Sequence, residues 1–198
     1  MMPNILRIDS SIKTQGSISR QLTDEILAKL TAAHPDATVT SRDLGAQPLP
    51  ATDADWLVAV NTPAEQRSDS QAEIATLSDT LIAELKAADI VVIALPIYNF
   101  AVPAQLKIWL DQMARAGETF RYSEAGPEGL VQNTRAIIAY SSNGTRMGSE
   151  IDFASGYLRH MLGFFGITDV QFVASDHYAI DPESSLKHAS DTIATLAA

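Results

Sequence analysis

The sequence predicts an α/β fold built on a doubly wound, five-stranded parallel sheet with helices on both faces. Two observations predict this fold. Short apolar strands alternate with amphipathic segments of helix length along the 198 residues, and one apolar run, residues 90–95, is typical of a strand buried on both faces. Right-handed crossovers leave few topologies for such a chain, and the strand order 2-1-3-4-5 is the commonest for five strands.

The first predicted strand, residues 5–9, leads into a hydroxyl-rich turn over residues 10–19. The turn contains Ser11, Ser17 and Ser19, and Ser17 is placed to cap a helix whose apolar residues recur every four positions. Hydroxyls, backbone N–H groups and the helix dipole therefore converge at one point. We interpret the turn as an anion site, with simple helix capping as the alternative. Neither G-x-G-x-x-G nor G-x-x-x-x-G-K-[ST] occurs in the chain, which favours a terminal monophosphate over a triphosphate.

The second predicted strand, residues 38–44, has the polar alternation of an edge strand. Residues 61–71 are interpreted as a polar loop. Ser70 and Glu73 fit a capping box for a long helix that runs to Ala88. This helix is expected to cross over to the third strand.

The third predicted strand, residues 90–95, ends at Pro96 and is followed by a cluster of aromatic and amide residues. The cluster contains Tyr98, Asn99 and Phe100, and a helix over residues 104–113 follows it with a proline in its first turn. In an open α/β sheet, ligands bind where the carboxyl end of a strand meets the amino end of a helix. The cluster is therefore a candidate binding loop.

Residues 116–130 form an excursion without a helical period. Aromatic residues that look exposed, among them Phe120 and Tyr122, lie between turn signals, which predicts short strand-like pieces. The excursion is either a surface loop packed on its own protein or a segment that covers a ligand or reaches a second subunit. Apart from it, residues 1–198 are expected to form a single domain.

The last predicted elements alternate again between strand and helix. They are a strand at residues 136–140, a helix that begins at Asp152 with Phe153 on its apolar side, a strand at residues 170–174 and a helix that opens at Pro182. A small polar turn, residues 141–145, follows the first of these strands. In the order 2-1-3-4-5 the switch point lies between strands one and three, so three unusual turns are expected to line one crevice.

Composition excludes several classes of function. A formal charge of −10 argues against nucleic acid and anionic membrane surfaces as partners. The chain has no cysteine, and its four histidines show no metal-ligand spacing, so no metal site is expected. The start lacks a cationic leader, and no apolar run approaches the roughly 20 residues that span a bilayer, so we expect a cytoplasmic protein.

The predicted crevice has an anion end made of serines and an aromatic end with an amide. A flat ligand with a phosphate tail fits such a crevice, and flavin mononucleotide (FMN) is the obvious candidate. Hydride chemistry belongs to that cofactor, and the protein supplies orientation and electrostatics. No catalytic protein nucleophile is therefore expected.

In several motifs the chain resembles the FMN-dependent NADH-azoreductases, which also act as quinone reductases. The motifs cover nearly the whole chain and are densest over residues 77–130. They include Pro96-Ile97-Tyr98-Asn99-Phe100, Ala114-Arg115-Ala116-Gly117, Thr119-Phe120-Arg121-Tyr122 and Gly126-Pro127-Glu128-Gly129-Leu130. The resemblance implies a flavodoxin-like homodimer with FMN in each subunit near the dimer interface. It also implies ping-pong transfer from NADH to FMN and then to a quinone or azo compound.

The resemblance also implies a role for individual positions. The FMN phosphate would be held by Ser11, Ser17, Ile18 and Ser19. The ribityl chain and ring would be bound by Pro96, Ile97, Tyr98, Asn99 and Phe100. The polar edge of the ring would face Ser141, Ser142, Asn143 and Gly144, where the family usually has Ser-Arg-Gly-Gly, a departure that bears on flavin tuning and substrate preference. Phe120 would reach the partner's flavin and cover the substrate.

A different class of protein, an acidic flavodoxin-like electron carrier without enzymatic activity, is the alternative. The excursion over residues 116–130 argues against it, because it is more than a small one-electron shuttle needs and would obstruct a protein partner at the flavin edge. A phosphate-signalling receiver is set aside, because it needs a phosphorylatable aspartate where this chain has Leu95 and Pro96.

Overall fold

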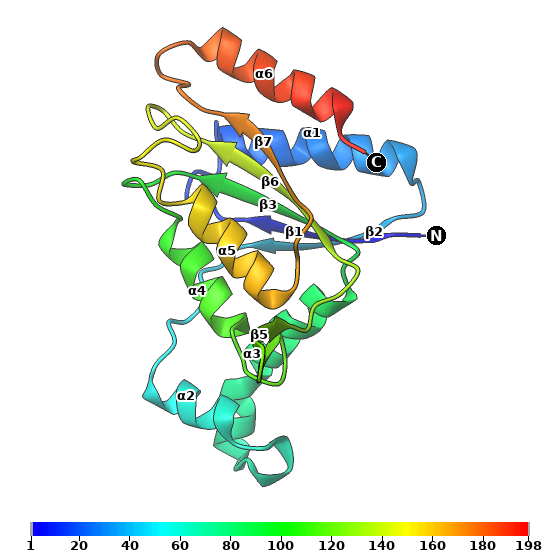
Figure 1. Cartoon of the computed structure of the whole chain (residues 1–198), viewed down its shortest axis with the longest axis vertical. Coiled ribbons are helices and arrows are strands. Elements are labelled where there is room, and N and C mark those ends of the chain that lie inside the picture. The colour runs from blue at the N-terminus through cyan, green and yellow to red at the C-terminus, as the bar shows by residue number, and fades with distance from the viewer. Residues whose placement is uncertain (1, 198) are drawn as a thin grey trace.

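The structure is a computed structural model that describes residues 2–197. At its centre lies a parallel sheet of five strands in the order β2-β1-β3-β6-β7 (Figure 1). Counted within this sheet, the order is the predicted 2-1-3-4-5. In spatial order the strands are β2 (Thr38–Asp43), β1 (Asn4–Asp9), β3 (Ile90–Pro96), β6 (Arg135–Ser141) and β7 (Val170–Ser175).

The burial of each strand follows its place in the sheet. Every residue of β3 is buried, because strands flank it on both sides and helices cover both faces. The edge strand β2 is exposed at four of its six positions. The uniform apolar run of β3 and the polar alternation of β2 in the sequence therefore correctly predicted which strand is central and which is at the edge.

Helices cover both faces of the sheet (Figure 1). One face carries α1 (Ile18–Ala33) and α6 (Pro182–Thr195), and the other carries α3 (Asp69–Ala87), α4 (Ala104–Met113) and α5 (Ser155–Phe165). Each face has its own apolar core. The core under α1 and α6 contains Leu22, Ile26 and Ile193, and the other contains Leu85, Trp109 and Leu162.

A short helix, α2 (Ala54–Asn61), lies in a segment for which no element was predicted, and a 3-10 helix (Ala64–Gln66) follows it. Eight residues are too few to show a helical period, and Leu57 and Val58 are exposed rather than turned to a core. The available signal was Asp53, whose side chain accepts a hydrogen bond from the Trp56 N–H at the helix start. In Figure 1, α2 lies at the end of the molecule farthest from α6.

The start of α3 was predicted two residues too late. Ser68, not Ser70, is the N-cap, and it forms a reciprocal capping box with Gln71. Both pairs have the required three-residue spacing, so the sequence alone did not separate them. The predicted loop over residues 61–71 is correspondingly shorter, because it contains the 3-10 helix and the first turn of α3.

The prediction that Asp152 begins a helix was also wrong. The helix α5 starts at Ser155, and Phe153 lies before it with 64% of its surface exposed. The Asp152 carboxylate accepts hydrogen bonds from the backbone N–H groups of Ala154 and Ser155, so it ties down the turn that precedes the helix. Burial opposes ionisation of this carboxyl, but these bonds and one from the Ser155 hydroxyl keep the pKa of Asp152 below its usual value.

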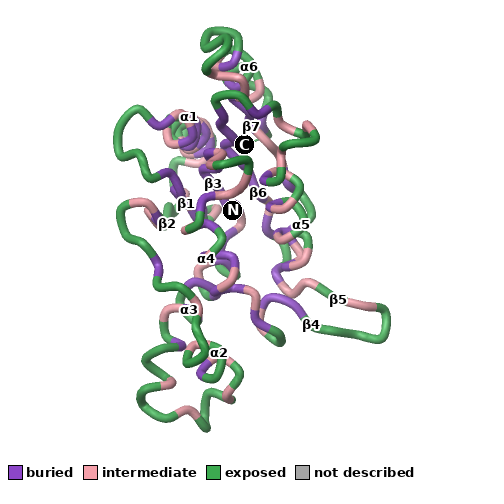
Figure 2. The backbone as a smooth tube through the Cα atoms, turned by 90° about the vertical axis from the view of Figure 1, so that its left-hand side faces the viewer, coloured by how far each residue is buried: buried purple, intermediate pink, exposed green. Residues whose placement is uncertain are grey.

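The excursion is an antiparallel hairpin of β4 (Phe120–Ser123) and β5 (Gly126–Gly129), which projects from the body of the molecule (Figure 2). The expectation that its aromatic residues are exposed was wrong for Phe120. This residue is only 8% exposed, and its ring centroid lies 4.3 Å from that of Phe164. Tyr122 is 74% exposed. The base of the hairpin therefore belongs to the core, while its tip faces solvent.

Two further properties concern the described part of the chain. None of the helices among residues 2–197 combines the length and the apolar character of a membrane span. Within the same residues, no three His, Asp or Glu side chains are grouped so that they could share a metal ion.

Candidate functional site

Three loops from the carboxyl ends of β1, β3 and β6 meet at one cleft. The cleft has a volume of about 220 Å³. Most of the residues predicted to bind a ligand line it, and these are Ser11, Ser17, Ile18, Pro96, Ile97, Tyr98, Ser141, Ser142 and Asn143. The predicted crevice at the switch point between β1 and β3 is therefore a real hollow at the expected place.

One end of the cleft is formed by the start of α1. Ser17 is the N-cap of this helix with extended backbone angles (φ −87°, ψ 116°), but its hydroxyl does not cap the helix. Instead Ser17 Oγ lies 3.3 Å from Ser19 Oγ. The first backbone N–H groups of an α-helix have no acceptor within the helix, and the helix dipole adds partial positive charge there. Because Ser17 leaves these N–H groups uncapped, the arrangement favours anion binding over the alternative of simple helix capping.

Arg20 holds the loop that follows β1. Its guanidinium donates two hydrogen bonds to the Asp43 carboxylate, at 2.7 and 2.6 Å, and one to the Ser11 carbonyl at 2.7 Å. The hydrogen bonds from Arg20 hold the pKa of the Asp43 carboxyl below its usual value. Gly45 lies against the same carbonyl, where an added Cβ would be 2.1 Å from the Ser11 oxygen. The end of β2 and the side chain of Arg20 thus fix Ser11 from two sides.

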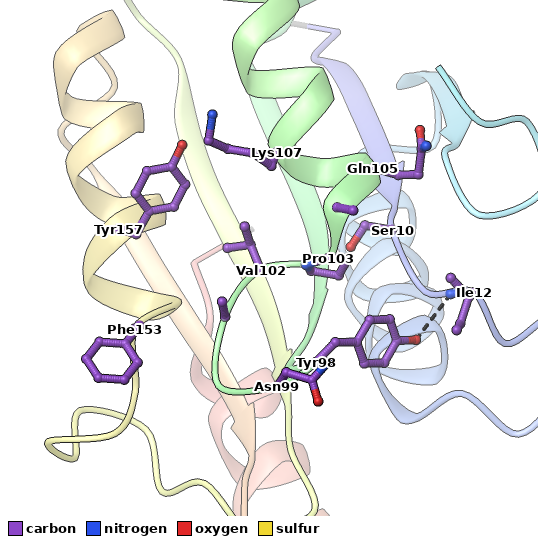
Figure 3. Close-up of a pocket in the computed structure, with 12 residues that line it drawn as sticks. Ser10, Ile12, Tyr98, Asn99, Val102, Pro103, Gln105, Lys107, Phe153 and Tyr157 are labelled. Carbon is purple, nitrogen blue, oxygen red and sulfur yellow. Dashed lines mark hydrogen bonds between the residues drawn. The ribbon is translucent and has the colours of Figure 1, made fainter. Parts of the chain in front are cut away.

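The loop after β3 is joined to the loop after β1 through Tyr98. The Tyr98 hydroxyl lies 3.2 Å from Ser11 Oγ and accepts a hydrogen bond of 3.2 Å from the Ile12 N–H (Figure 3). The next two residues, Asn99 and Phe100, both have positive φ values, 49° and 71°. Such angles are uncommon for residues other than glycine, and strained backbone of this kind occurs often at ligand sites.

The turn after β6 forms the third wall of the cleft. The Ser142 hydroxyl donates to the Thr145 carbonyl, so this side chain is engaged within the turn. Asn143 and Gly144 are exposed. The backbone carbonyl of Ser142 accepts from the Tyr178 N–H at 3.1 Å, which ties the turn to the loop between β7 and α6.

Four of the residues predicted to bind FMN do not line the cleft. Ser19 is fully buried beneath it, and Phe100 and Gly144 lie outside its lining. Asn99 lines a neighbouring hollow instead. Conversely, the cleft is lined by three residues that were not predicted, Lys13, Gly16 and Tyr178. Lys13 and Gly16 lie within the predicted turn and could have been included, whereas Tyr178 follows the last strand of the sheet and had no signal.

The neighbouring hollow is a larger groove of about 680 Å³ on the other side of Tyr98 (Figure 3). Its walls are mainly apolar and include Ile12, Val102 and Phe153. Lys107 and Tyr157 add polar groups at the α4 and α5 side. The Asp111 carboxylate, 2.5 Å from Lys107 Nζ, raises the pKa of this amine, so Lys107 is a cation at neutral pH. Tyr98 is part of the wall of both hollows.

Phe120, the predicted substrate-covering residue, lies in neither hollow of its own chain. The hairpin that carries it is held by Arg115, which is buried and donates to the Asp79 carboxylate at 2.5 Å and to the Ser78 hydroxyl at 3.1 Å. Within residues 2–197, Phe120 therefore contributes to packing against α5 and not to the cleft.

Residues 3–197 match a protein family described as having a flavodoxin-like fold. An FMN-dependent NADH:quinone oxidoreductase of Cereibacter sphaeroides is 55% identical to this chain over 197 residues, and the match covers 100% of both proteins. An FMN-dependent NADH:quinone oxidoreductase 1 of Hahella chejuensis is 47% identical over 190 residues, which cover 96% of this chain and 93% of that protein. This chain belongs to the family of FMN-dependent NADH:quinone oxidoreductases.

The solved structures similar to this family member include azoreductases. One is an FMN-dependent NADH-azoreductase from Bacillus anthracis in complex with FMN, which has a TM-score of 0.87 and 25% sequence identity to this chain. The superposition covers 97% of this chain and 96% of the other. The expected family and the flavodoxin-like fold are thereby confirmed.

Proposed function

We propose that this chain is an FMN-dependent NADH oxidoreductase that reduces quinones and azo compounds, with NADH and the acceptor using one site in turn. One observation carries the proposal. Three loops that are distant in the sequence meet at a single cleft, which is lined by serines, by the start of α1 and by aromatic side chains. The names of the relatives, which specify FMN and NADH, support the same assignment.

The phosphate of FMN fits the end of the cleft that is formed by the start of α1. Because the Ser17 hydroxyl does not cap α1, the hydroxyls of Ser11 and Ser17 and the first N–H groups of the helix are available as donors. The left-handed Gly16 (φ 64°) lets the loop turn sharply before the helix begins. No magnesium ligand or Walker-type lysine motif is needed for a monophosphate held in this way.

The ring of FMN would lie between the loops after β3 and β6. Pro96, Ile97 and Tyr98 offer backbone groups and an aromatic face, and the exposed Asn143 amide can donate to and accept from the polar edge of the ring. The Ser142 hydroxyl is already bonded to the Thr145 carbonyl, so we assign the polar contact to Asn143. When bound, FMN supplies the redox chemistry, accepting a hydride from NADH and delivering two electrons to the acceptor.

The groove beyond Tyr98 is the proposed acceptor site. Its volume of about 680 Å³ falls within the roughly 300–1,000 Å³ of typical ligand pockets. Its apolar walls suit the flat, apolar rings of quinones and azo dyes, and they limit access of water to the reacting edge. Because one exposed face of the ring would serve both donor and acceptor, we propose ping-pong kinetics.

We further propose that the protein is a homodimer in which Phe120 faces the partner's flavin. The hairpin that carries Phe120 projects from the body (Figure 2). The ring of the exposed Tyr122 packs edge-on against the Phe120 ring, with the two ring centroids 5.6 Å apart. An exposed aromatic side chain such as Tyr122 on a projecting hairpin is typical of a protein interface, whereas Phe120 is buried in the single chain. Sedimentation is expected to give twice the chain mass of 21.3 kDa, and a monomer would contradict the dimer.

Steady-state oxidation of NADH with menadione tests the activity. We expect saturable turnover that requires FMN, with parallel lines in double-reciprocal plots of rate against NADH at several menadione concentrations. Intersecting lines would contradict the ping-pong order. A yellow protein whose flavin is not reduced by NADH would contradict the enzymatic assignment and favour the electron carrier.

A further inference from the structure

The cations of β1, of the loop that follows it and of the start of α1 differ in how they are used. Arg7 is paired with the carboxylates of Asp9 and Asp24, both at 2.6 Å. Arg20, although it is the third residue of α1, turns its guanidinium to Asp43 and to the Ser11 carbonyl. Both arginines are therefore neutralised by neighbouring carboxylates and stabilise the loop.

Lys13 is placed differently. It lines the cleft beside Gly16 and Ser17, and its backbone N–H donates to Ser11 Oγ at 3.2 Å, which fixes its position next to the hydroxyls. Within residues 2–197, its ammonium group forms no ion pair, and no carboxylate lines this cleft. Lys13 is the one lysine or arginine in the cleft lining.

The charge of the whole chain makes this placement consequential. With a formal charge of −10, the protein repels a phosphate dianion at long range, and hydroxyls and N–H groups supply no net charge to offset this. A lysine at the rim of the anion end provides one full positive charge at the place where the ligand carries its negative charge.

We propose that the Lys13 ammonium pairs with the phosphate of the bound flavin and that this contact favours FMN over unphosphorylated flavin. This inference rests on the proposed function and adds one binding residue to it. The contact is with the ligand tail only, so Lys13 has no part in hydride transfer.

The test is a titration of the flavin-free protein with FMN and with riboflavin, followed by quenching of flavin fluorescence. The variant Lys13→Gln removes the charge, and Lys13→Arg keeps it. Lys86→Gln is the control for net charge, because it makes the same change in charge at the end of α3, which precedes the start of β3 and so lies at the opposite end of the sheet. Lys86 pairs with Glu118 at 2.7 Å, so the folding of this variant is checked by urea unfolding. Titrations are run at about 20 mM and about 500 mM salt, where the screening lengths differ severalfold.

At low salt we expect Lys13→Gln to weaken FMN binding about two- to fivefold, since a partly solvated charge pair contributes no more than this. The loss should shrink at high salt, riboflavin should bind the variant as it binds the wild type, and Lys13→Arg should restore most of the FMN affinity. The proposal is overturned if Lys13→Gln and Lys86→Gln bind FMN equally, or if riboflavin loses as much affinity as FMN. A wild-type protein that binds no FMN would instead refute the proposed function itself.

Discussion

The Tyr98 hydroxyl lies 3.2 Å from Ser11 Oγ, so a side chain from the loop after β3 reaches a side chain from the loop after β1. The two strands are neighbours in the sheet, but the two residues are 87 positions apart. The same hydroxyl also accepts from the Ile12 N–H. Tyr98 thereby links the loop after β3 to the loop after β1, that is, the proposed ring end of the cleft to its proposed phosphate end.

Replacing Tyr98 with phenylalanine removes this link and keeps the ring. We expect Tyr98→Phe to remain folded and to bind FMN about fivefold more weakly, because a hydrogen bond of this kind contributes about 1 kcal/mol. Fluorescence titration measures the change. Tyr122→Phe is the control, since Tyr122 is exposed on the hairpin and should behave as wild type. Unchanged FMN affinity in Tyr98→Phe would show that the link does not organise the cleft.

Adding a methyl group at Gly45 tests whether the turn after β2 supports Ser11. A Cβ there would lie 2.1 Å from the Ser11 carbonyl oxygen, so Gly45→Ala should displace the serine loop, destabilise the fold by about 1–3 kcal/mol and weaken FMN binding. Urea unfolding and FMN titration measure the two effects. The control is Gly156→Ala in α5. Outside the neighbouring residues and the backbone of the same helix, no atom lies within 4 Å of a Cβ added there. The higher helix propensity of alanine should raise the free energy of unfolding of this variant by up to about 1 kcal/mol. Equal stability of the two variants would contradict the predicted clash.

The Arg20–Asp43 pair predicts a pH dependence of stability. Hydrogen bonds from Arg20 lower the pKa of Asp43 in the folded protein, so the unfolded chain binds more protons in acid. The stabilisation is therefore present at neutral pH and is lost as the pH falls from the ordinary carboxyl pKa, about 4, down through the lower pKa of Asp43 in the folded protein. We expect Asp43→Asn to unfold at lower urea concentration than wild type at pH 7 and to lose less stability on acidification. Parallel pH profiles for the two proteins would contradict this role.

Replacing Tyr178 tests whether this residue, which was not predicted to line the cleft, contacts the ligand. Its backbone N–H bonds to the Ser142 carbonyl, and its side chain lines the cleft with Ser17 and Asn143. Tyr178→Ala should weaken FMN binding about two- to tenfold, because an aromatic contact contributes about 0.5–1.5 kcal/mol. Tyr178→Phe keeps the ring and should bind FMN nearly as tightly as the wild type. If the alanine variant binds FMN as tightly as wild type, Tyr178 does not contact the ligand.

The features that sequence reasoning predicted correctly are those that depend on local patterns. The apolar run of β3, the proline at its end and the serines before α1 each follow from the chemistry of a few neighbouring residues. The strand order follows from the handedness of crossovers. Together these observations placed the cleft at the correct ends of the correct strands.

The features that were missed depend on contacts between distant segments. Phe120 is buried because Phe164 of α5 packs on it, and a pattern within the hairpin does not contain that information. Tyr178 reaches the cleft because its backbone is tied to the turn after β6. Lys13 lies within the predicted turn, but a lysine in a polar loop is by default a solvated residue, so its place in the turn did not by itself assign it a binding role.

The central claim is that one cleft binds FMN by its phosphate and its ring, and the absorbance spectrum of the protein after incubation with FMN and gel filtration tests it most directly. We predict a yellow protein with one FMN per chain, whose visible bands bleach when NADH is added without oxygen. A protein that elutes colourless, with all the FMN in the small-molecule fraction, would contradict the claim.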